Sequence, residues 1–241
     1  MSFARSILLL SLLSSPVYAD TATHEIQYKG FKVWLDCSTH SATRWEYRTT
    51  KDTDNLPRDN YFYLDPNIPS KCQQTSTRTY KTPKGAVKYD RGHLVPANAM
   101  DSDPVSIRQS NIMTNVLPQV AQMNRGAWYQ TEVYVECRRN EFDLTVLGGV
   151  YRGTMPADGD FLVSHGVTAP EAFWKIAYWG NQLIAWWVPN SEEAVASRID
   201  DYITTVKEIE NRVGYSIDVP DYLKEMKPFS TSARTASCKL D

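Results

Sequence analysis

The sequence predicts an α+β domain with a central, largely antiparallel sheet flanked by helices, and the order of its elements is the main reason. Short alternating or β-branched segments lie in the first and last parts of the chain, and a helical pattern stands between them. Strands and helices do not alternate regularly, as they do in parallel α/β folds. With 241 residues, 42% of them hydrophobic, and no repeat or linker, the chain is expected to form one domain.

The first 19 residues have the organisation of a secretory signal peptide. Arg5 precedes an apolar run over residues 7–13, and Val17 and Ala19 stand before Asp20 at positions that suit signal peptidase. A membrane anchor is the alternative, but the run is far shorter than the roughly 20 apolar residues that span a bilayer. We therefore expect cleavage after Ala19 and an exported domain over residues 20–241, periplasmic or secreted, without a membrane-spanning segment.

Four segments read as strands. Residues 26–35, "IQYKGFKVWL", predict a strand pair or one long strand, and residues 61–64 and 144–150 predict short strands. Residues 173–188 predict a hairpin, because two apolar runs are joined by the turn pair Gly180-Asn181. The aromatic side chains of this hairpin are expected in the core.

Two segments read as helices. Residues 117–139 carry apolar or small residues at steps of three or four, namely Val120, Met123, Ala127, Thr131 and Val135. A second helix is expected between Asn190, a good N-cap, and Gly214, a typical helix end, although the β-branched run over residues 202–206 is unfavourable in its middle.

The cysteines predict disulfides, because all four lie in the part that would be exported to an oxidising compartment. Three connectivities are open, and we favour Cys37 with Cys72 and Cys137 with Cys238. A zinc site is the alternative, but the sequence has no close CxxC pair.

Two polar patterns suggest a site. The stretch "KYDRGHLVPANAM" places His93 beside charged residues, which suits proton chemistry, anion contact or metal binding. On the predicted central helix, Asn124, Trp128 and Glu132 recur at four-residue steps, so that an amide and a carboxylate would share a face directed at His93. The alternatives are a solvated surface histidine and a hydrated helix stripe. Gly126 is unfavourable in a helix, which suggests that another group approaches the backbone there.

Together these residues resemble the DNA/RNA non-specific endonucleases, the ββα-metal nucleases that include secreted bacterial nucleases and mitochondrial endonuclease G. The resemblance rests on "YDRGHLVPA" followed by "SNIMTNVLPQVAQMNRGAWYQTE", and it continues more weakly through "RDNYFYLDP", "EAFWKI" and "EIENRVG". It thus covers most of the mature chain and implies the ββα-metal fold. The DRGH box, the Asn-x-Gly-x-Trp motif and the downstream glutamate are specific in combination.

The resemblance also implies roles for individual residues. His93 matches the general base, Asn124 the direct protein ligand to magnesium, and Glu132 the outer carboxylate. Arg58 and Arg91 match arginines near the scissile phosphate, Asn115 matches an asparagine that supports the site, and Asp90 is expected to hold the motif. The chain departs from the family at Arg125, where many members have glutamine.

The chemistry of phosphodiester hydrolysis explains these residue types. The anionic phosphate repels hydroxide, so a base must deprotonate water and positive charge must stabilise the transition state. Magnesium keeps several waters, and one amide oxygen with a carboxylate acting through water can hold it; manganese is the candidate substitute. The net charge of −2 offers no general attraction to nucleic acid, so local arginines must supply it. We therefore expect a secreted, magnesium-dependent endonuclease acting on DNA and RNA with little sequence preference. The alternatives are a catalytically silent nucleic-acid-binding module and a phosphodiesterase for small nucleotides.

Overall fold

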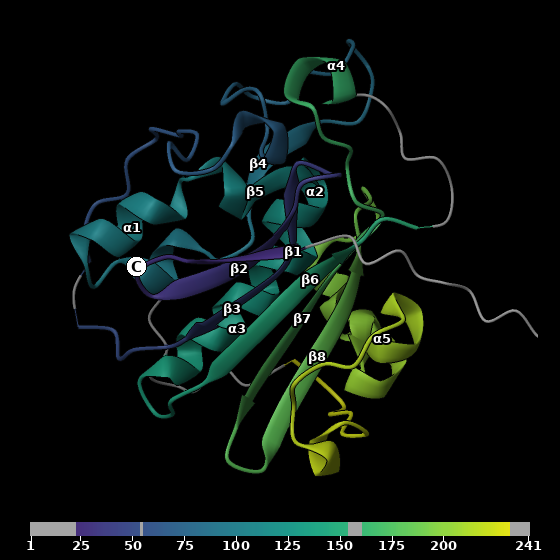
Figure 1. The fold of residues 1–241 in the computed structure, drawn as a ribbon. Helices are drawn as coiled ribbons and strands as arrows, with labels where there is room; N and C mark the ends of the chain where they lie inside the picture. The colour runs from purple at the N-terminus through teal and green to yellow at the C-terminus, as the bar shows by residue number, and fades with distance from the viewer. Residues whose placement is uncertain (1–22, 54, 154–160, 232–241) are drawn as a thin grey trace, which may run out of the picture.

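A seven-stranded sheet in the order β1-β2-β3-β6-β7-β8-β9 forms the centre of the molecule (Figure 1). The computed structural model describes residues 23–53, 55–153 and 161–231. Every strand pair of this sheet is antiparallel, which confirms the predicted α+β class. The strands are β1 (Thr23–Gln27), β2 (Phe31–Asp36), β3 (Ser41–Arg48), β6 (Thr145–Tyr151), β7 (Ala172–Trp179), β8 (Gln182–Pro189) and β9 (Ile203–Thr204).

Most of the predicted strands are confirmed. Residues 26–35 form the strand pair β1 and β2, residues 144–150 fall on β6, and the hairpin β7–β8 turns at Gly180 and Asn181. The prediction for residues 61–64 is wrong, because only Tyr63 pairs, in a single bridge with Ile112. The Tyr63 amide donates to the Asn111 carbonyl and the Tyr63 carbonyl accepts from the Met113 amide, and these two bonds make one parallel bridge and no strand.

The helices are short, and both helix predictions need correction. The α-helices are α1 (Pro104–Ser110), α2 (Ala121–Met123), α3 (Tyr129–Arg139), α4 (Leu162–His165) and α5 (Val206–Val213), with 3₁₀ turns at Ser70–Cys72, Ala97–Met100, Met113–Asn115, Ala196–Tyr202 and Asp221–Leu223. Residues 117–120 belong to β5 (Val116–Val120), whose residues are all buried, so it lacks the alternation that marks a half-exposed strand.

The second predicted helix is confirmed as an α-helix only at its C-terminal end, and its middle holds the 3₁₀ helix Ala196–Tyr202. Thr205 begins α5, because its hydroxyl accepts from the backbone of Glu208 while the Glu208 carboxylate accepts from the backbone of Thr205. The β-branched residues before this cap extend the sheet as β9, and Gly214 ends the helix in the left-handed conformation, as expected. Within the described ranges, no helix has the length and apolar character needed to cross a bilayer.

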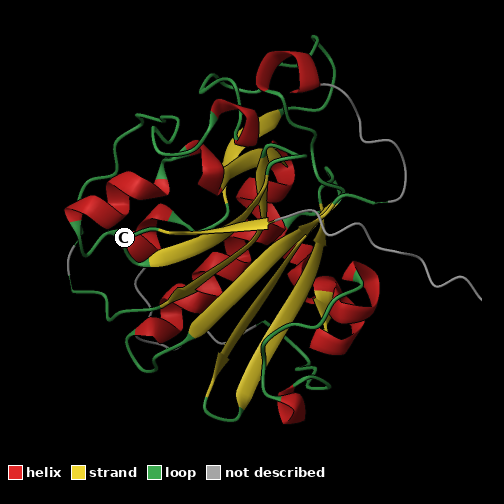
Figure 2. Ribbon diagram, in the orientation of Figure 1, coloured by secondary structure: helices red, strands yellow, loops and turns green. Residues whose placement is uncertain are grey.

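The two faces of the sheet are covered by different helices (Figure 2). Alternate residues of β7 point to opposite faces. Phe173 joins the core that includes Trp128 and the α3 residues Tyr134 and Val135, whereas Ile176 joins the core formed with α5. The α3 side carries the functional elements.

A second, two-stranded sheet lies on the α3 side. Strand β4 (Tyr89–His93) pairs antiparallel with β5, and the chain continues from β5 through α2 into α3, which makes the ββα unit. Gly92 is required between the strands, because a Cβ atom there would lie 2.2 Å from the side chain of Gln119. The pairing fixes His93 at the end of β4, opposite Val116.

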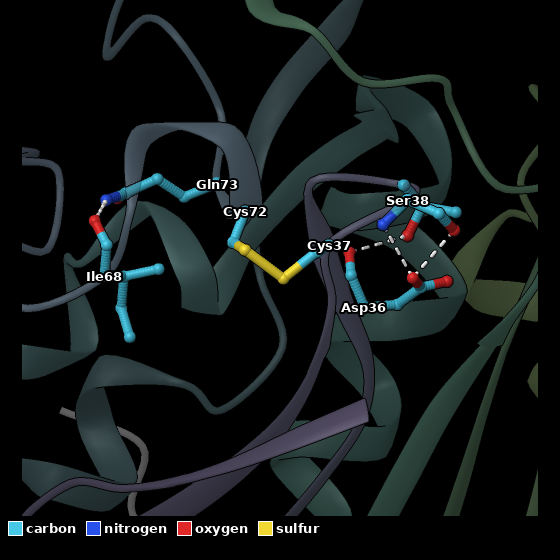
Figure 3. Close-up of a disulfide and its surroundings, with 7 residues drawn as sticks. Asp36, Cys37, Ser38, Ile68, Cys72 and Gln73 are labelled. Atoms are coloured by element: carbon cyan, nitrogen blue, oxygen red, sulfur yellow. Dashed lines mark hydrogen bonds between the residues drawn. A yellow bond between two sulfur atoms is a disulfide. The ribbon is translucent and has the colours of Figure 1, made fainter. Parts of the chain in front are cut away.

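The predicted disulfide Cys37–Cys72 is present and joins the end of β2 to the turn at Ser70–Cys72 (Figure 3). Local hydrogen bonds hold both sides: Ser38 donates to the Asp36 carboxylate, and the Gln73 amide donates to the Ile68 carbonyl. Cys137 is also disulfide-bonded. Its predicted partner Cys238 lies outside the described residues, as does the predicted signal peptide, so both remain predictions.

Candidate active site

A cleft of about 490 Å³ brings most of the predicted site residues together. Its walls come from the loop after β3, from β4 and from the helical segment that follows β5. The sequence-predicted residues on its walls are Arg58, Arg91, His93, Asn124 and Glu132. These residues span 75 positions of the sequence, so the fold and not local sequence brings them together.

His93 lies almost buried in this cleft, and a relay of two side chains fixes its ring. The Asn111 amide nitrogen donates to both the carboxylate and the backbone carbonyl of Asp59, each at 3.0 Å. This orientation leaves the Asn111 Oδ1 atom 2.9 Å from the Nε2 atom of His93. Because Oδ1 can only accept, Nε2 carries the proton, and the lone pair of neutral His93 is on Nδ1. Phe62 packs against the ring at 5.5 Å between centroids.

The surroundings keep His93 unprotonated. Burial, together with the positive charges of Arg58 and Arg91, lowers the pKa of His93 from 6.5 to about 4, against the opposing hydrogen bond to Asn111. At neutral pH the ring is therefore a proton acceptor rather than a cation.

Asn124 is presented to the cleft by a widened turn. Residues Asn124–Trp128 form a π-helical segment between α2 and α3, and Gly126 inside it has the non-helical angles φ −106° and ψ −110°. A Cβ atom at Gly126 would lie 2.9 Å from the Ala194 carbonyl oxygen, and the Ala127 amide donates to that same oxygen. The expectation that another group approaches this backbone is confirmed: the group is the loop after β8.

The widened turn also corrects the predicted helix face. Trp128 is fully buried against Trp45 and Phe173 and does not line the cleft, while Asn124 and Glu132 do. In a regular helix, residues four apart lie above one another. The π segment has more residues in each turn than an α-helix, so the rotation from residue 124 to residue 128 is smaller and Trp128 turns into the core.

The Asn124 side chain is oriented by Asp90. Its amide nitrogen donates to the Asp90 carboxylate at 3.0 Å, so the amide oxygen is the atom of this cleft-lining side chain that could bind a metal. The exposed Arg125 donates two hydrogen bonds, of 2.8 and 2.6 Å, to the same carboxylate. Partial burial alone would raise the pKa of Asp90, but the bonds from Arg125 and Asn124 together outweigh it and lower the pKa.

Glu132 stands two turns along from Asn124, near a buried lysine. Lys175 of β7 is fully buried, donates to the Thr131 hydroxyl at 2.8 Å and lies 4.0 Å from the centre of the Trp128 ring. Burial raises the pKa of Glu132 against the attraction of Lys175 and Arg58, and burial lowers the pKa of Lys175 to about 8. Lys175 therefore supplies a positive charge that stabilises the ionised Glu132 carboxylate.

The remaining predicted residues take distinct positions. Arg91 lies over the Phe62 ring at 3.8 Å and donates to the Thr77 carbonyl at 2.8 Å, so it is held at the cleft wall. Arg58 is exposed on the loop at the mouth. Asn115 does not line the cleft: it is fully buried and exchanges hydrogen bonds of 2.9 Å with the backbone of Val95, two residues after His93.

The donor set fits magnesium better than zinc. No group of three or more His, Cys, Asp or Glu side chains in the described part of the chain could hold a metal ion. Asn124 nevertheless offers an amide oxygen whose nitrogen is already bound to Asp90, and Glu132 offers a carboxylate in the same cleft. A hard cation that keeps most of its waters needs few protein ligands.

Sequence reasoning missed Asn111, Asp59, Phe62 and Lys175. Asn111 lies within the stretch "SNIMTN" and Asp59 beside Arg58, so their positions in the motifs were the available signal. Lys175 had a clearer one, a lysine inside the apolar strand "FWKIAYW".

Comparisons with known proteins identify the family of the chain and several of its relatives. The sequence profile of the family described as DNA/RNA non-specific endonuclease matches residues 12–225. A nuclease of Serratia marcescens is 27% identical over 191 residues, which cover 75% of this chain and 70% of that protein. A nuclease of Nostoc sp. is 26% identical over 192 residues, which cover 72% of this chain and 63% of that protein. Among solved structures, the EndoG/EndoGI complex has a chain with a TM-score of 0.66 at 18% identity, covering 81% of this chain and 86% of that one, a likeness of fold.

Proposed function

Because this chain belongs to the DNA/RNA non-specific endonuclease family, we propose that its cleft hydrolyses phosphodiester bonds of DNA and RNA with magnesium and with little sequence preference. The observation that carries the proposal is the meeting of His93, Asn124 and Glu132 with two arginines in one cleft. A neutral imidazole, an amide oxygen and positive charge are what this hydrolysis requires.

His93 is the general base in this proposal. Its Nδ1 atom accepts a proton from water as the water oxygen bonds to phosphorus and the bond to the leaving oxygen breaks. Asn111 stabilises the imidazolium through its Oδ1 atom, and Asp59 keeps that amide from turning. Asn111 and Asp59 thus orient the imidazole and fix its tautomer, as a third group does for the general base in other hydrolases.

The arginines and the metal ligands address the phosphate. Arg91 and Arg58 compensate the charge that develops on the phosphate oxygens. Magnesium held by Asn124, with Glu132 reaching it through water, would supply Lewis acidity at the leaving oxygen. Asp90 and Arg125 keep the Asn124 oxygen directed into the cleft. These groups contact phosphate and carry no base information, which supports broad specificity.

A plasmid-nicking assay tests this function. The purified chain should convert supercoiled plasmid to nicked and linear forms with magnesium, and chelator should stop the reaction, with manganese as a parallel arm. His93→Ala should lower the rate ~10²–10⁴-fold, whereas His24→Ala, on β1 outside the cleft, should not. Binding without cleavage would instead identify a silent binding module, and cleavage of only small diesters would identify a nucleotide phosphodiesterase.

The proposal places this activity outside the cytoplasm. The predicted signal peptide over residues 1–19 and the disulfide Cys37–Cys72 support export, since disulfides persist in oxidising compartments. Expression of the full chain followed by cell fractionation and N-terminal sequencing of the product tests it. A mature chain that starts at Asp20 in the periplasm or medium is the expected result, and an intact cytoplasmic chain would contradict it.

A further inference from the structure

Helix α3 leaves one aromatic ring exposed, and that ring lies in the cleft. Of the eleven residues of α3, all of which the structure describes, Tyr129 alone is exposed. It is 44% exposed and lines the same cleft as His93 and Glu132. Its side chain forms no hydrogen bond and no ring contact with the described residues. A large and mostly apolar ring therefore faces the space in which the substrate would lie.

Tyr129 stands between the two residues that would hold the metal. Asn124 lies five positions before it, at the start of the π segment, and Glu132 lies three positions after it on α3. Side chains three apart on a helix are neighbours, with about 5–6 Å between their Cβ atoms. The ring is thus one helical turn from Glu132, close enough to the proposed phosphate position to meet the base of a flanking nucleotide.

The charges around Tyr129 suit a single nucleic-acid strand. Arg58, Arg91 and Arg125 line the same cleft. Arg125 is paired with Asp90, whereas Arg58 and Arg91 form no ion pair with the residues that the structure describes. Proteins bind single strands with this combination, in which cations follow the backbone and exposed aromatic rings stack on the bases.

An unpaired base is the partner that suits such a ring. Every base has a flat π face, so stacking on tyrosine does not select one base, which agrees with the broad specificity proposed above. In a duplex, the neighbouring bases cover both faces of an interior base, and taking that base out of the stack costs free energy. The Tyr129 ring is therefore of use mainly to strands whose bases are unpaired.

We propose that Tyr129 stacks on an unpaired base of a nucleotide that flanks the scissile phosphate, and that the cleft thereby prefers single-stranded DNA and RNA. This inference rests on the proposed function and adds a base subsite to it. Tyr129 is a positioning residue in this proposal, because it holds the strand and does not touch the reacting atoms. Loss of the ring should weaken cleavage of single strands more than cleavage of duplexes.

Removal of one base tests the stack within a single molecule. The substrate is an end-labelled, single-stranded oligothymidylate in which an abasic tetrahydrofuran residue replaces one internal nucleotide. The ladder of fragments gives the relative cleavage rate at every bond, so the bonds far from the abasic residue serve as the reference. The unmodified chain should cut a bond beside the abasic residue roughly 5- to 150-fold more slowly than the reference bonds, the range that stacking of one base supplies.

Three variants assign the slow bond to the ring. Tyr129→Leu removes the aromatic ring, so its ladder should be even through the abasic residue. Tyr129→Phe removes only the hydroxyl and should preserve the slow bond. Tyr222→Leu is the matched control, since Tyr222 is an exposed tyrosine outside the cleft, and it should also preserve the slow bond. Each ladder contains its own reference bonds, so partial unfolding of a variant lowers all rates together and leaves the ratio unchanged.

The preference for unpaired strands has its own measurement. Initial rates on a single-stranded oligonucleotide and on its blunt duplex, both below KM, give the ratio of the two activities for each protein. Tyr129→Leu should lower this ratio by roughly the same 5- to 150-fold. Tyr129→Phe and Tyr222→Leu should leave it unchanged.

The outcomes separate this inference from the proposed function. An even ladder from the unmodified chain, a slow bond that survives in Tyr129→Leu, or a slow bond that disappears in Tyr129→Phe overturns the stack. Equal losses on single strands and duplexes in Tyr129→Leu overturn the preference for unpaired strands. In all of these cases cleavage is observed, so the proposed nuclease function stands. No cleavage of any strand, in magnesium or manganese, overturns the proposed function and the inference with it.

Discussion

Acidification should destabilise the protein specifically through His93. In the folded chain the pKa of His93 falls from 6.5 to about 4, because of burial and then of Arg58 and Arg91. Below pH 6.5 the unfolded chain binds a proton at this residue, whereas the folded chain binds it only near pH 4. The free energy of unfolding therefore decreases as pH falls through this window. At ~1.4 kcal/mol for each pH unit between the two values, the loss is roughly 3 kcal/mol.

Urea denaturation of the unmodified chain and of His93→Gln at pH 7, 5.5 and 4 measures this loss. The difference between the two free energies of unfolding removes the contribution of the other ionisable groups, provided that both proteins unfold in two states. Between pH 7 and pH 4 we expect the unmodified chain to lose about 3 kcal/mol more of its free energy of unfolding than His93→Gln loses. Parallel curves over that range would refute the assignment of a buried, neutral His93.

The same residue predicts the pH dependence of the reaction. The acidic limb of kcat/KM reports the base of the free enzyme, so it should lie near pH 4 and not near 6.5. Removing the nearby charge in Arg58→Gln should move the limb toward neutral pH, while it also lowers the rate. A limb near 6.5 in the unmodified chain would show that the ring is solvated.

Four further changes test other parts of the structure. Asn124→Ala should strongly raise the magnesium concentration that gives half-maximal activity. Glu132→Gln should raise that concentration only roughly tenfold, because Glu132 acts through water. Magnesium titrations of the nicking rate give both values, and equal shifts would contradict the assignment. Gly126→Ala should cost about 1–3 kcal/mol in urea denaturation, because its Cβ atom would lie 2.9 Å from a backbone oxygen of the facing loop. Reductant should lower the melting temperature, since the Cys37–Cys72 bridge closes a loop with a sequence separation of 35 and contributes roughly 3–4 kcal/mol; an unchanged melting temperature would refute this contribution.

The sequence predicted the elements whose signals are local. The hairpin β7–β8 follows from its turn pair and apolar runs, and α5 ends where Gly214 predicted. Strand β5 was hidden because burial of both faces removes the alternation that identifies a strand. The helix predicted from Asn190 to Gly214 is divided: Ala196–Tyr202 form a 3₁₀ helix, Ile203–Thr204 join the sheet as β9, and the capping box at Thr205 starts α5 later than the cap-like Asn190 suggested.

In the candidate site too, the residues with local sequence signals were predicted and those that depend on distant contacts were not. The motif positions directed attention to His93 and Asn124, which the structure brings into one cleft. The Asp59–Asn111 relay joins residues 52 positions apart, and no pattern in a single sequence records such a contact. Trp128 was placed on the wrong face because the periodicity argument assumes 3.6 residues in each turn, and the π segment breaks that assumption.

The loop after β8 makes the ββα unit inseparable from the rest of the chain. Asn190 accepts from the Val120 amide and donates to the carbonyls of Pro118 and Pro170, and the Ala194 carbonyl accepts from the Ala127 amide. The turn that presents Asn124 is therefore shaped by residues some 70 positions away. A β4–α3 fragment transplanted into another protein would lose these hydrogen bonds. Residues inserted between 190 and 194 would displace the turn that carries Asn124, although they lie far from it in sequence. Engineering of this nuclease should leave that loop at its native length and place fusions elsewhere.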